Sequence, residues 1–164
     1  LVNAGRCYIM VTSFVFALFA TFGFCILFHV PLRCMLPAAA IGGIGWFAYQ
    51  LLMELGLGIT ASAFLASCLV ALLADICSRL IKEAATVFVI PGILPLVPGA
   101  GIYYTMFHFI RGNMDKAAAW GTRTLMIAGA IALGLLVIAS LIRIIVNTKR
   151  NIKRWNDKRK GSAV

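Results

Sequence analysis

A cluster of three prolines and three glycines within residues 89–105 constrains this chain more than any other feature. The cluster lies inside an uncharged apolar run, residues 84–110, and consists of Pro91, Gly92, Pro95, Pro98, Gly99 and Gly101. Each proline removes a backbone donor and clashes with the carbonyl four residues earlier, and each glycine permits turns that other residues resist. A plain helix cannot continue through such a stretch. The sequence therefore predicts a helix broken by a Pro/Gly motif.

The setting of this break is a membrane. Hydrophobic residues make up 62% of the 164 residues and charged residues 12%, which is the composition of an integral membrane protein. In hydrocarbon a broken helix leaves polar backbone groups unpaired, at a cost of several kcal/mol each, unless protein or a watery cavity receives them. We therefore expect the break to line a solute site near the bilayer midplane, as in secondary transporters.

Five apolar runs predict an all-α polytopic membrane protein with a broken fourth span. The expected spans are residues 8–30, 36–53, 59–80, 84–110 and 117–146, which together form a transmembrane domain, residues 1–146. Residues 32–35 are expected as a tight connection. The first run, at about 23 residues, is read as a span because it exceeds the usual apolar core of a signal peptide. The alternative is four spans, with the short second run failing to cross.

Charge predicts the orientation. Fifteen basic residues oppose five acidic ones, and seven of the basic residues lie between Lys149 and Lys160. Because cytoplasmic loops collect Lys and Arg, the basic tail, residues 147–164, is expected inside, on anionic lipid. Counting back through five spans places the N-terminus outside the inner (plasma) membrane, whereas four spans would place it inside. The tail contains one aromatic residue, Trp155, and lacks the aromatic interleaving typical of nucleic-acid modules, so no nucleic-acid partner is expected.

The expected solute site follows the break. A helix that restarts after Gly99 presents free N–H groups and a positive dipole end, which suit a carboxylate. Hydroxyl groups follow at once on Tyr103, Tyr104 and Thr105, and Gln50, Ser62 and Ser67 could bond a solute or hold helices together. The candidate substrate-binding residues are Pro91, Gly92, Pro95, Pro98, Gly99, Gly101, Tyr103, Tyr104, Thr105 and Ser67. A packing kink without a solute is the alternative interpretation.

Asp75 is the only carboxylate well inside an apolar run, and an intramembrane acid is by default a functional hypothesis. It is a candidate for proton coupling or for pairing with an amine. Arg79 follows four residues later, so a structural pair on one helix face is the alternative. His108, which could titrate near neutral pH, is the second proton-coupling candidate, against the alternative of an interfacial histidine.

Enzymatic chemistry is not expected from this sequence. It contains no paired carboxylates, no metal-ligand cluster, no nucleophile with a histidine at a readable spacing and no phosphate loop. Its five cysteines show no Cys-x-x-Cys spacing and are expected to pack as small apolar residues. We therefore expect no metal and no cofactor.

One segment carries a family resemblance: Ile90-Pro-Gly-Ile-Leu-Pro-Leu-Val-Pro-Gly-Ala-Gly-Ile-Tyr-Tyr104. Together with Phe28-His-Val-Pro-Leu-Arg33, Gly42-Gly-Ile-Gly45 and Phe64-Leu-Ala-Ser-Cys-Leu-Val70, it resembles the threonine/serine exporter family, in the short split-subunit form related to succinate export. The resemblance covers about residues 8–146. It implies a half-transporter that works with a longer subunit made of a soluble N-terminal domain plus five spans. Asp75 and the basic tail depart from the short relative, which leaves the substrate open.

These observations predict a subunit of a secondary-active exporter of small carboxylate metabolites, amino acids of the threonine and serine type, acting with the longer partner. Two alternatives stay open. One is a subunit that exports dicarboxylates such as succinate, and the other is a membrane assembly or channel subunit that transports nothing itself. A higher oligomer of the complex is compatible with all three.

Overall fold

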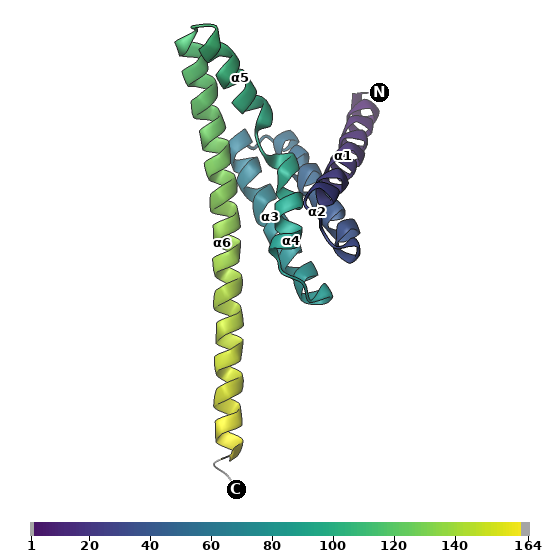
Figure 1. Ribbon diagram of the computed structural model, residues 1–164, viewed down its shortest axis with the longest axis vertical. Coiled ribbons are helices and arrows are strands. Elements are labelled where there is room, and N and C mark those ends of the chain that lie inside the picture. Colours follow the sequence, from purple (N-terminus) through teal and green to yellow (C-terminus); the bar gives the residue numbers. More distant parts are fainter. Residues whose placement is uncertain (1, 162–164) are drawn as a thin grey trace.

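The chain folds into helices throughout the described backbone. The computed structural model describes the backbone of residues 2–161 and the side-chain environments of residues 10–146 and 148. The elements, shown in Figure 1, are α1 (Val2–Leu27), α2 (Leu32–Glu54), α3 (Ile59–Ile81), α4 (Thr86–Ile93), the short 3-10 helix η1 (Leu94–Leu96), α5 (Gly99–Ile110) and α6 (Met114–Gly161). No strand occurs in residues 2–161. The predicted all-α fold is confirmed.

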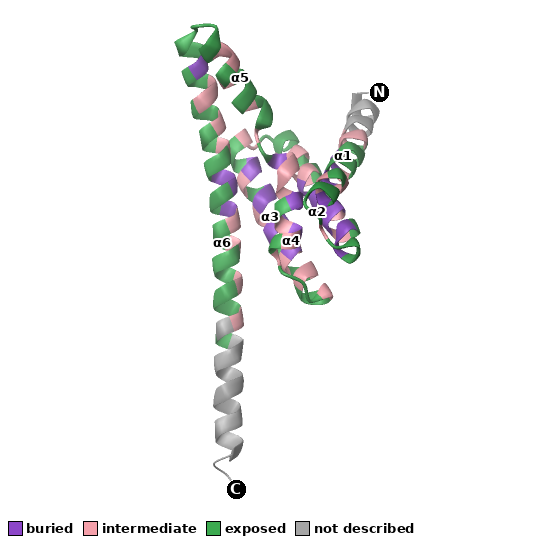
Figure 2. Ribbon diagram, in the orientation of Figure 1, coloured by how far each residue is buried: buried purple, intermediate pink, exposed green. Residues whose placement is uncertain are grey.

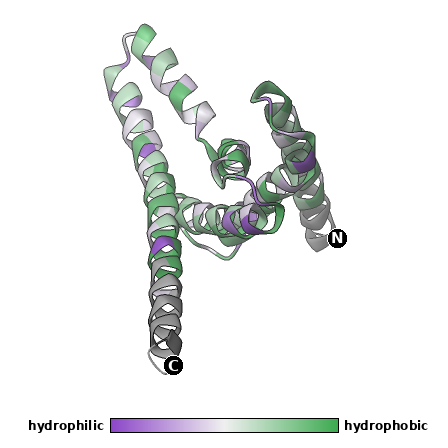
Figure 3. Cartoon of the chain, turned by 60° about the horizontal axis from the view of Figure 1, so that its bottom comes forward, coloured by the Kyte–Doolittle hydropathy of each residue, from purple (hydrophilic) through white to green (hydrophobic). Residues whose placement is uncertain are grey.

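Within the described residues, four helices are long and apolar enough to cross a membrane: Met10–Leu27, Leu32–Glu54, Ile59–Ile81 and Met114–Val146. A fifth span is formed if the bent pair Thr86–Leu96 and Gly99–Ile110, whose axes differ by 52°, crosses as one unit. Counted in this way, the described chain has five candidate spans with a broken fourth, as the sequence predicts for a polytopic membrane protein. Figure 3 shows apolar residues along all of these helices.

The first connection is shorter than the sequence suggests. Helix α1 ends at Leu27 because His29 adopts the left-handed conformation, with φ 53°, and the Val30 N–H then bonds the Cys25 carbonyl at 2.9 Å. This is the Schellman arrangement that closes many helices. Residues 32–35, expected as a loop, are instead the first turn of α2, and Pro31 stands at its N-cap. The expectation for residues 32–35 was wrong because a proline with φ −54° sets up helix entry directly.

Two further turns use glycine to reverse the chain. Gly56 has φ 86° and follows α2, and Gly112 has φ 72° and follows α5. After each, the next residue donates to the carbonyl five positions earlier, at 3.2 Å from Leu57 to Leu52 and 3.0 Å from Asn113 to His108. These turns produce two helical hairpins, α2–α3 and α5–α6.

Helix α2 lies at the centre of the packed part and contacts α1, α3 and α4. Figure 2 shows most of the buried residues on α2, α3 and α4. The core is rich in small side chains, which let the helices approach closely without a hydrophobic driving force in lipid. Its buried members are Cys25, Cys34, Met35, Ala38, Ile41, Ala63, Ala66, Val70, Ala74, Phe88, Leu96 and Ile131.

Helices α5 and α6 form an arm that Figure 1 shows diverging from α1. No residue of α5 is buried. Helix α6 packs on α3 further along and continues unbroken to Gly161, so the expected boundary between span and tail at residue 146 is not marked by a helix end. Apart from Thr148, the side chains of the tail, residues 147–164, lie outside the described residues, and so does their predicted contact with lipid.

Candidate functional site

The break itself occupies only Val97 and Pro98. Pro91 lies within α4 and Pro95 within η1, so neither ends the helical turn that holds it. Val97 is extended, with ψ 128°, and Pro98 has φ −76° and ψ 60°, the values of an inverse γ-turn. The Gly99 N–H accordingly bonds the Val97 carbonyl at 2.7 Å. A two-residue break is enough to redirect the helix.

Backbone N–H groups near this turn, which were expected to bind a solute, are partly bonded within the chain. Gly99 donates to Val97, and Ile102 donates to the Pro98 carbonyl at 3.2 Å. A helix start normally has four N–H groups without an intrahelical partner, but Pro98 at the N-cap has no N–H and Gly99 is already bonded, so those of Ala100 and Gly101 remain. Gly99 and Ala100 are exposed, and Gly101 is half-buried because its Cα approaches the Thr124 side chain of α6. The restart of the helix therefore offers a reduced set of donors, at the surface of this chain.

The first half of the broken helix is anchored in the core. Phe88, Pro91 and Gly92 are buried. A Cβ at Gly92 would stand 3.1 Å from the Ile41 side chain of α2 and 3.4 Å from Val70 of α3. Gly92 thus acts as a close-packing residue between α4 and its two neighbours, and neither Pro91 nor Gly92 presents a polar group to a solute.

The hydroxyl residues after the break point in different directions. The Thr105 hydroxyl donates to the Gly101 carbonyl of its own helix at 2.7 Å. Tyr104 packs on Trp120 of α6 with 5.0 Å between ring centroids, and Tyr103 is 63% exposed. The cavity between α5 and α6 that Thr105 lines is otherwise apolar apart from Thr124, whose hydroxyl donates to the Trp120 carbonyl. These residues do not form one polar pocket within this chain.

Ser67 lies at the contact between α3 and α6. It is fully buried, and its hydroxyl donates to the Phe64 carbonyl at 2.7 Å. Gly134 of α6 sits directly against it, and the neighbouring Cys68 thiol donates to the Gly134 carbonyl at 3.6 Å. The Ser67 hydroxyl thus bonds within its own helix, α3, at a place where α6 packs closely. Two other polar atoms, Oγ of Ser62 and Oε1 of Gln50, are buried without a hydrogen-bond partner among the described residues.

Asp75 is held by Arg79 on the same helix. The Arg79 Nε atom donates to Oδ2 at 2.6 Å, and Nη2 donates to Oδ1 at 3.3 Å. The Asp75 side chain is 21% exposed, against 52% for Arg79. The carboxylate also lines a cavity of about 370 Å³ between α3, the start of α4 and α6, which Arg143 lines as well.

The two proton-coupling candidates are far apart. Asp75 shares its cavity with Arg143, near the end of the apolar part of α6. His108 is half-buried in the last turn of α5, next to the start of α6, with its ring edge-on to Phe107 at 5.5 Å. The structure therefore does not bring the two residues into one relay.

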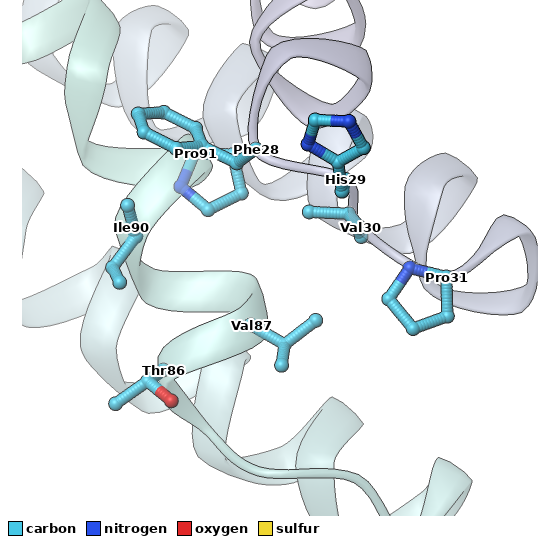
Figure 4. A pocket seen from close by; sticks show the side chains of 8 residues that line it. All are labelled: Phe28, His29, Val30, Pro31, Thr86, Val87, Ile90 and Pro91. Atoms are coloured by element: carbon cyan, nitrogen blue, oxygen red, sulfur yellow. The ribbon is translucent and has the colours of Figure 1, made fainter.

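A second cavity, of about 220 Å³, lies on another side of α4. It is lined by Phe28, His29, Val30 and Pro31 of the first connection and by Thr86, Val87, Ile90 and Pro91 of α4. Figure 4 shows Thr86 and His29 on opposite sides of this pocket, with Val30 and Val87 between them. Pro95 lines a further hollow, of about 330 Å³, with Ser13, Phe16, Ala17, Ala20 and Trp46. The predicted site residues are thus distributed over several separate hollows.

Sequence reasoning missed two polar residues that the fold places beside Asp75. Thr86 lines both cavities that adjoin α4, and Arg143 reaches the larger one from α6. Arg143 could be read only as a charge near the end of a span, and Thr86 only as a residue at the start of the apolar run. No group of three or more His, Cys, Asp or Glu side chains that could hold a metal ion occurs in the described part of the chain.

A family model described as threonine/serine exporter, ThrE, matches residues 13–141. The matched range contains the whole broken helix, Asp75 and every predicted site residue, and it ends two residues before Arg143. No solved structure matches the chain.

Proposed function

This chain belongs to the threonine/serine exporter family, and from that premise we propose that it is one subunit of a secondary-active exporter. Its solutes are small carboxylate metabolites, amino acids of the threonine and serine type, and its partner is a longer subunit with a soluble N-terminal domain and five spans of its own. Export uses the broken helix and the cavities beside α4, with Asp75 as the proton-coupling group and His108 as a second candidate.

The observation that carries the partner proposal is the exposure of α5. A broken span ought to be surrounded by protein where its backbone leaves the helix, because unpaired polar groups are costly in lipid. Yet α5 has no buried residue, and the hydroxyl-bearing side chains of Tyr103 and Tyr104 are 63% and 42% exposed. A second set of helices packed against α5 would supply the missing wall and enclose the break.

The proposed location rests on the family, the apolar helices and the distribution of basic residues. The family and the four to five apolar helices support a membrane exporter. We propose the inner (plasma) membrane, with the N-terminus outside and the C-terminus in the cytoplasm, because the basic residues concentrate after Lys149. In this orientation the connections 28–31 and 82–85, and the cavities next to them, face the cytoplasm.

The test is solute efflux from proteoliposomes that contain this chain with and without the longer subunit. The vesicles are preloaded in turn with labelled threonine, serine or succinate. We expect efflux of threonine and serine only when both subunits are present, driven by an imposed proton gradient. Efflux of succinate alone would replace the substrate class by dicarboxylates.

Two results would reject the proposal more deeply. Efflux from the chain alone at the rate of the pair would remove the need for a partner. An intact pair that exports none of the three solutes would favour a subunit with an assembly or channel role, and the break would then be a structural kink. In the pair that carries Asp75→Asn, efflux should lose its response to the proton gradient while the two subunits stay assembled.

A further inference from the structure

The cavity beside the start of α4 has the make-up of a binding site. It measures about 370 Å³ and is lined by three polar residues, the half-buried Asp75 of α3 and the exposed Thr86 of α4 and Arg143 of α6. The rest of the wall is apolar: Ala71, Ala85, Val89, Leu135, Ile138, Ala139 and Ile142. A pocket within the usual size range, with apolar walls and a few convergent polar groups, is typical of small-molecule sites.

Asp75 enters this wall already oriented. Arg79, which is not part of the wall, contacts both of its carboxylate oxygens, at 2.6 and 3.3 Å. An ionised carboxylate offers about four lone-pair positions, so two remain for donors on the cavity side. The pair with Arg79 fixes the side chain and leaves acceptor capacity for a cation.

Arg143 is the complementary group. Among the described side chains it has no acidic partner and no hydrogen bond, and the same holds for the Thr86 hydroxyl. A guanidinium carries five N–H donors in a planar fork that fits a carboxylate in two-point contact. Arg143 is an exposed residue that lines a largely apolar cavity, so its unpaired guanidinium is accessible to an anionic group.

We infer that this cavity binds the charged head of a small zwitterion, with the ammonium at Asp75 and the anionic group at Arg143, an inference that rests on the proposed exporter function. In an α-amino acid the ammonium and the carboxylate are attached to the same carbon, and the Thr86 hydroxyl can form a hydrogen bond with a polar atom of this head that the other two residues leave unpaired. A dicarboxylate brings no cation to Asp75 and sets a like charge against it. The site thus separates amino acids from dicarboxylates by charge.

Its place in the fold suits export. In the proposed orientation the cavity lies at the cytoplasmic end, where an exporter takes up its solute. It contacts the first turn of α4, and α4 with η1 leads directly from there to the break at Val97 and Pro98. Occupation of the cavity can therefore bias the position of the same helix that ends at the break.

The experiment measures binding to the complete two-subunit complex in nanodiscs that lack ethanolamine lipid. The ligands are labelled L-threonine, threonine amide, which lacks the carboxylate, and 2,3-dihydroxybutyrate, which lacks the ammonium. Because a hydrogen bond to a charged group is worth roughly 10-fold or more in affinity, wild type is expected to prefer threonine over each analogue by at least about tenfold.

Each variant should lose one preference only. Arg143→Gln is expected to bind threonine and threonine amide equally, and Asp75→Asn to bind threonine and 2,3-dihydroxybutyrate equally. Arg123→Gln, another arginine of α6 but outside this wall, should keep the wild-type pattern. A general structural defect would weaken all three ligands alike, so the loss of a single preference is specific to a contact.

The inference is overturned if Arg143→Gln still prefers threonine over its amide, since Arg143 has no described partner whose loss could unfold the chain. A phosphatidylethanolamine headgroup offers the same pair of charges, an ammonium and an anion. If this lipid, when added, displaces threonine from the wild-type complex but not from Arg143→Gln, the site is supported and its resident occupant is a lipid. A complex that shows these preferences yet exports nothing would refute the exporter and keep the site. Efflux unchanged by Arg143→Gln would refute the site and keep the exporter.

Discussion

The two halves of the broken helix share one Pro/Gly motif but have opposite surroundings. Helix α4 places Phe88, Pro91 and Gly92 in the core, whereas α5 has no buried residue. Gly92 is packed between side chains of α2 and α3, and a Cβ at Gly99 would meet nothing within 4 Å. The first half therefore belongs to the fold of this chain. Within this chain the second half packs on α6, and it depends on lipid or on another subunit for the rest of its environment, which is why a partner is expected there.

The largest difference should appear when an aromatic residue is removed from each half. Phe88→Ala empties a fully buried position of α4, and Phe109→Ala trims a residue of α5 that is 55% exposed. We expect Phe88→Ala to lower the free energy of unfolding by on the order of 2–3 kcal/mol. The loss comes mainly from the cavity that the substitution leaves, because in a membrane the unfolded helices face lipid and not water. Phe109→Ala should cost well under about 1 kcal/mol in the isolated chain.

Unfolding of both variants in mixed micelles, titrated with a denaturing detergent, measures the two values. Repeating it with the longer subunit present sharpens the comparison. Phe109→Ala should then become costly if α5 is covered by the partner. If the two substitutions lower the free energy of unfolding of the isolated chain equally, α4 and α5 do not differ in burial as described here.

A smaller effect is expected from the glycines. Gly92→Ala brings a Cβ to 3.1 Å from the Ile41 side chain, tighter than an ordinary contact, so this side chain must give way by a few tenths of an ångström. We expect a loss of about 1 kcal/mol, at the low end of the cost of overpacking a core. Gly99→Ala has open space and should be neutral or stabilising by up to about 1 kcal/mol, since alanine restricts the unfolded chain. Thermal unfolding of the two variants in the same detergent tests this, and a lower midpoint for Gly99→Ala than for Gly92→Ala would contradict it.

The smallest effect is expected at Thr105. Its hydroxyl is already bonded to the Gly101 carbonyl, and its methyl group faces Gly121 of α6. Thr105→Val keeps the shape and removes one intrahelical bond, so stability and efflux by the complex should stay close to wild type. Thr86→Val is the matched substitution in the other half, and it should reduce threonine efflux because Thr86 lines the cavity with Asp75 and Arg143. A large loss of efflux in Thr105→Val would indicate that the solute binds at the break of the helix and not in the cavity beside Asp75.

Much of the architecture could be predicted because it depends on local composition. Long apolar runs predict spans, and Pro98 with its neighbours predicts a break, since both follow from backbone chemistry alone. The boundaries were less accurate. The turn at His29 uses a left-handed residue that is not glycine, so no glycine marked where α1 ends.

The candidate site was harder to predict than the spans. Asp75 was recognised because a carboxylate in an apolar run is conspicuous by itself. Arg143 and Thr86 were not, because they are 68 and 11 positions away from Asp75 and become its neighbours only when α3, α4 and α6 pack together. Pro91, Gly92 and Ser67 were expected at a solute site, and this stays a prediction. All three are buried, Gly92 and Ser67 at contacts between helices and Pro91 in the wall of the 220 Å³ cavity.

By itself, the sequence determined that this chain is an all-helical membrane protein with a helix broken near Pro98, because apolar length and missing backbone donors act within a few residues. It also contained the motif that relates the chain to threonine/serine exporters. The tertiary structure alone decided which half of the broken helix is buried and which charges share a cavity. Both depend on contacts between helices far apart in the chain, and no local pattern of residues records them.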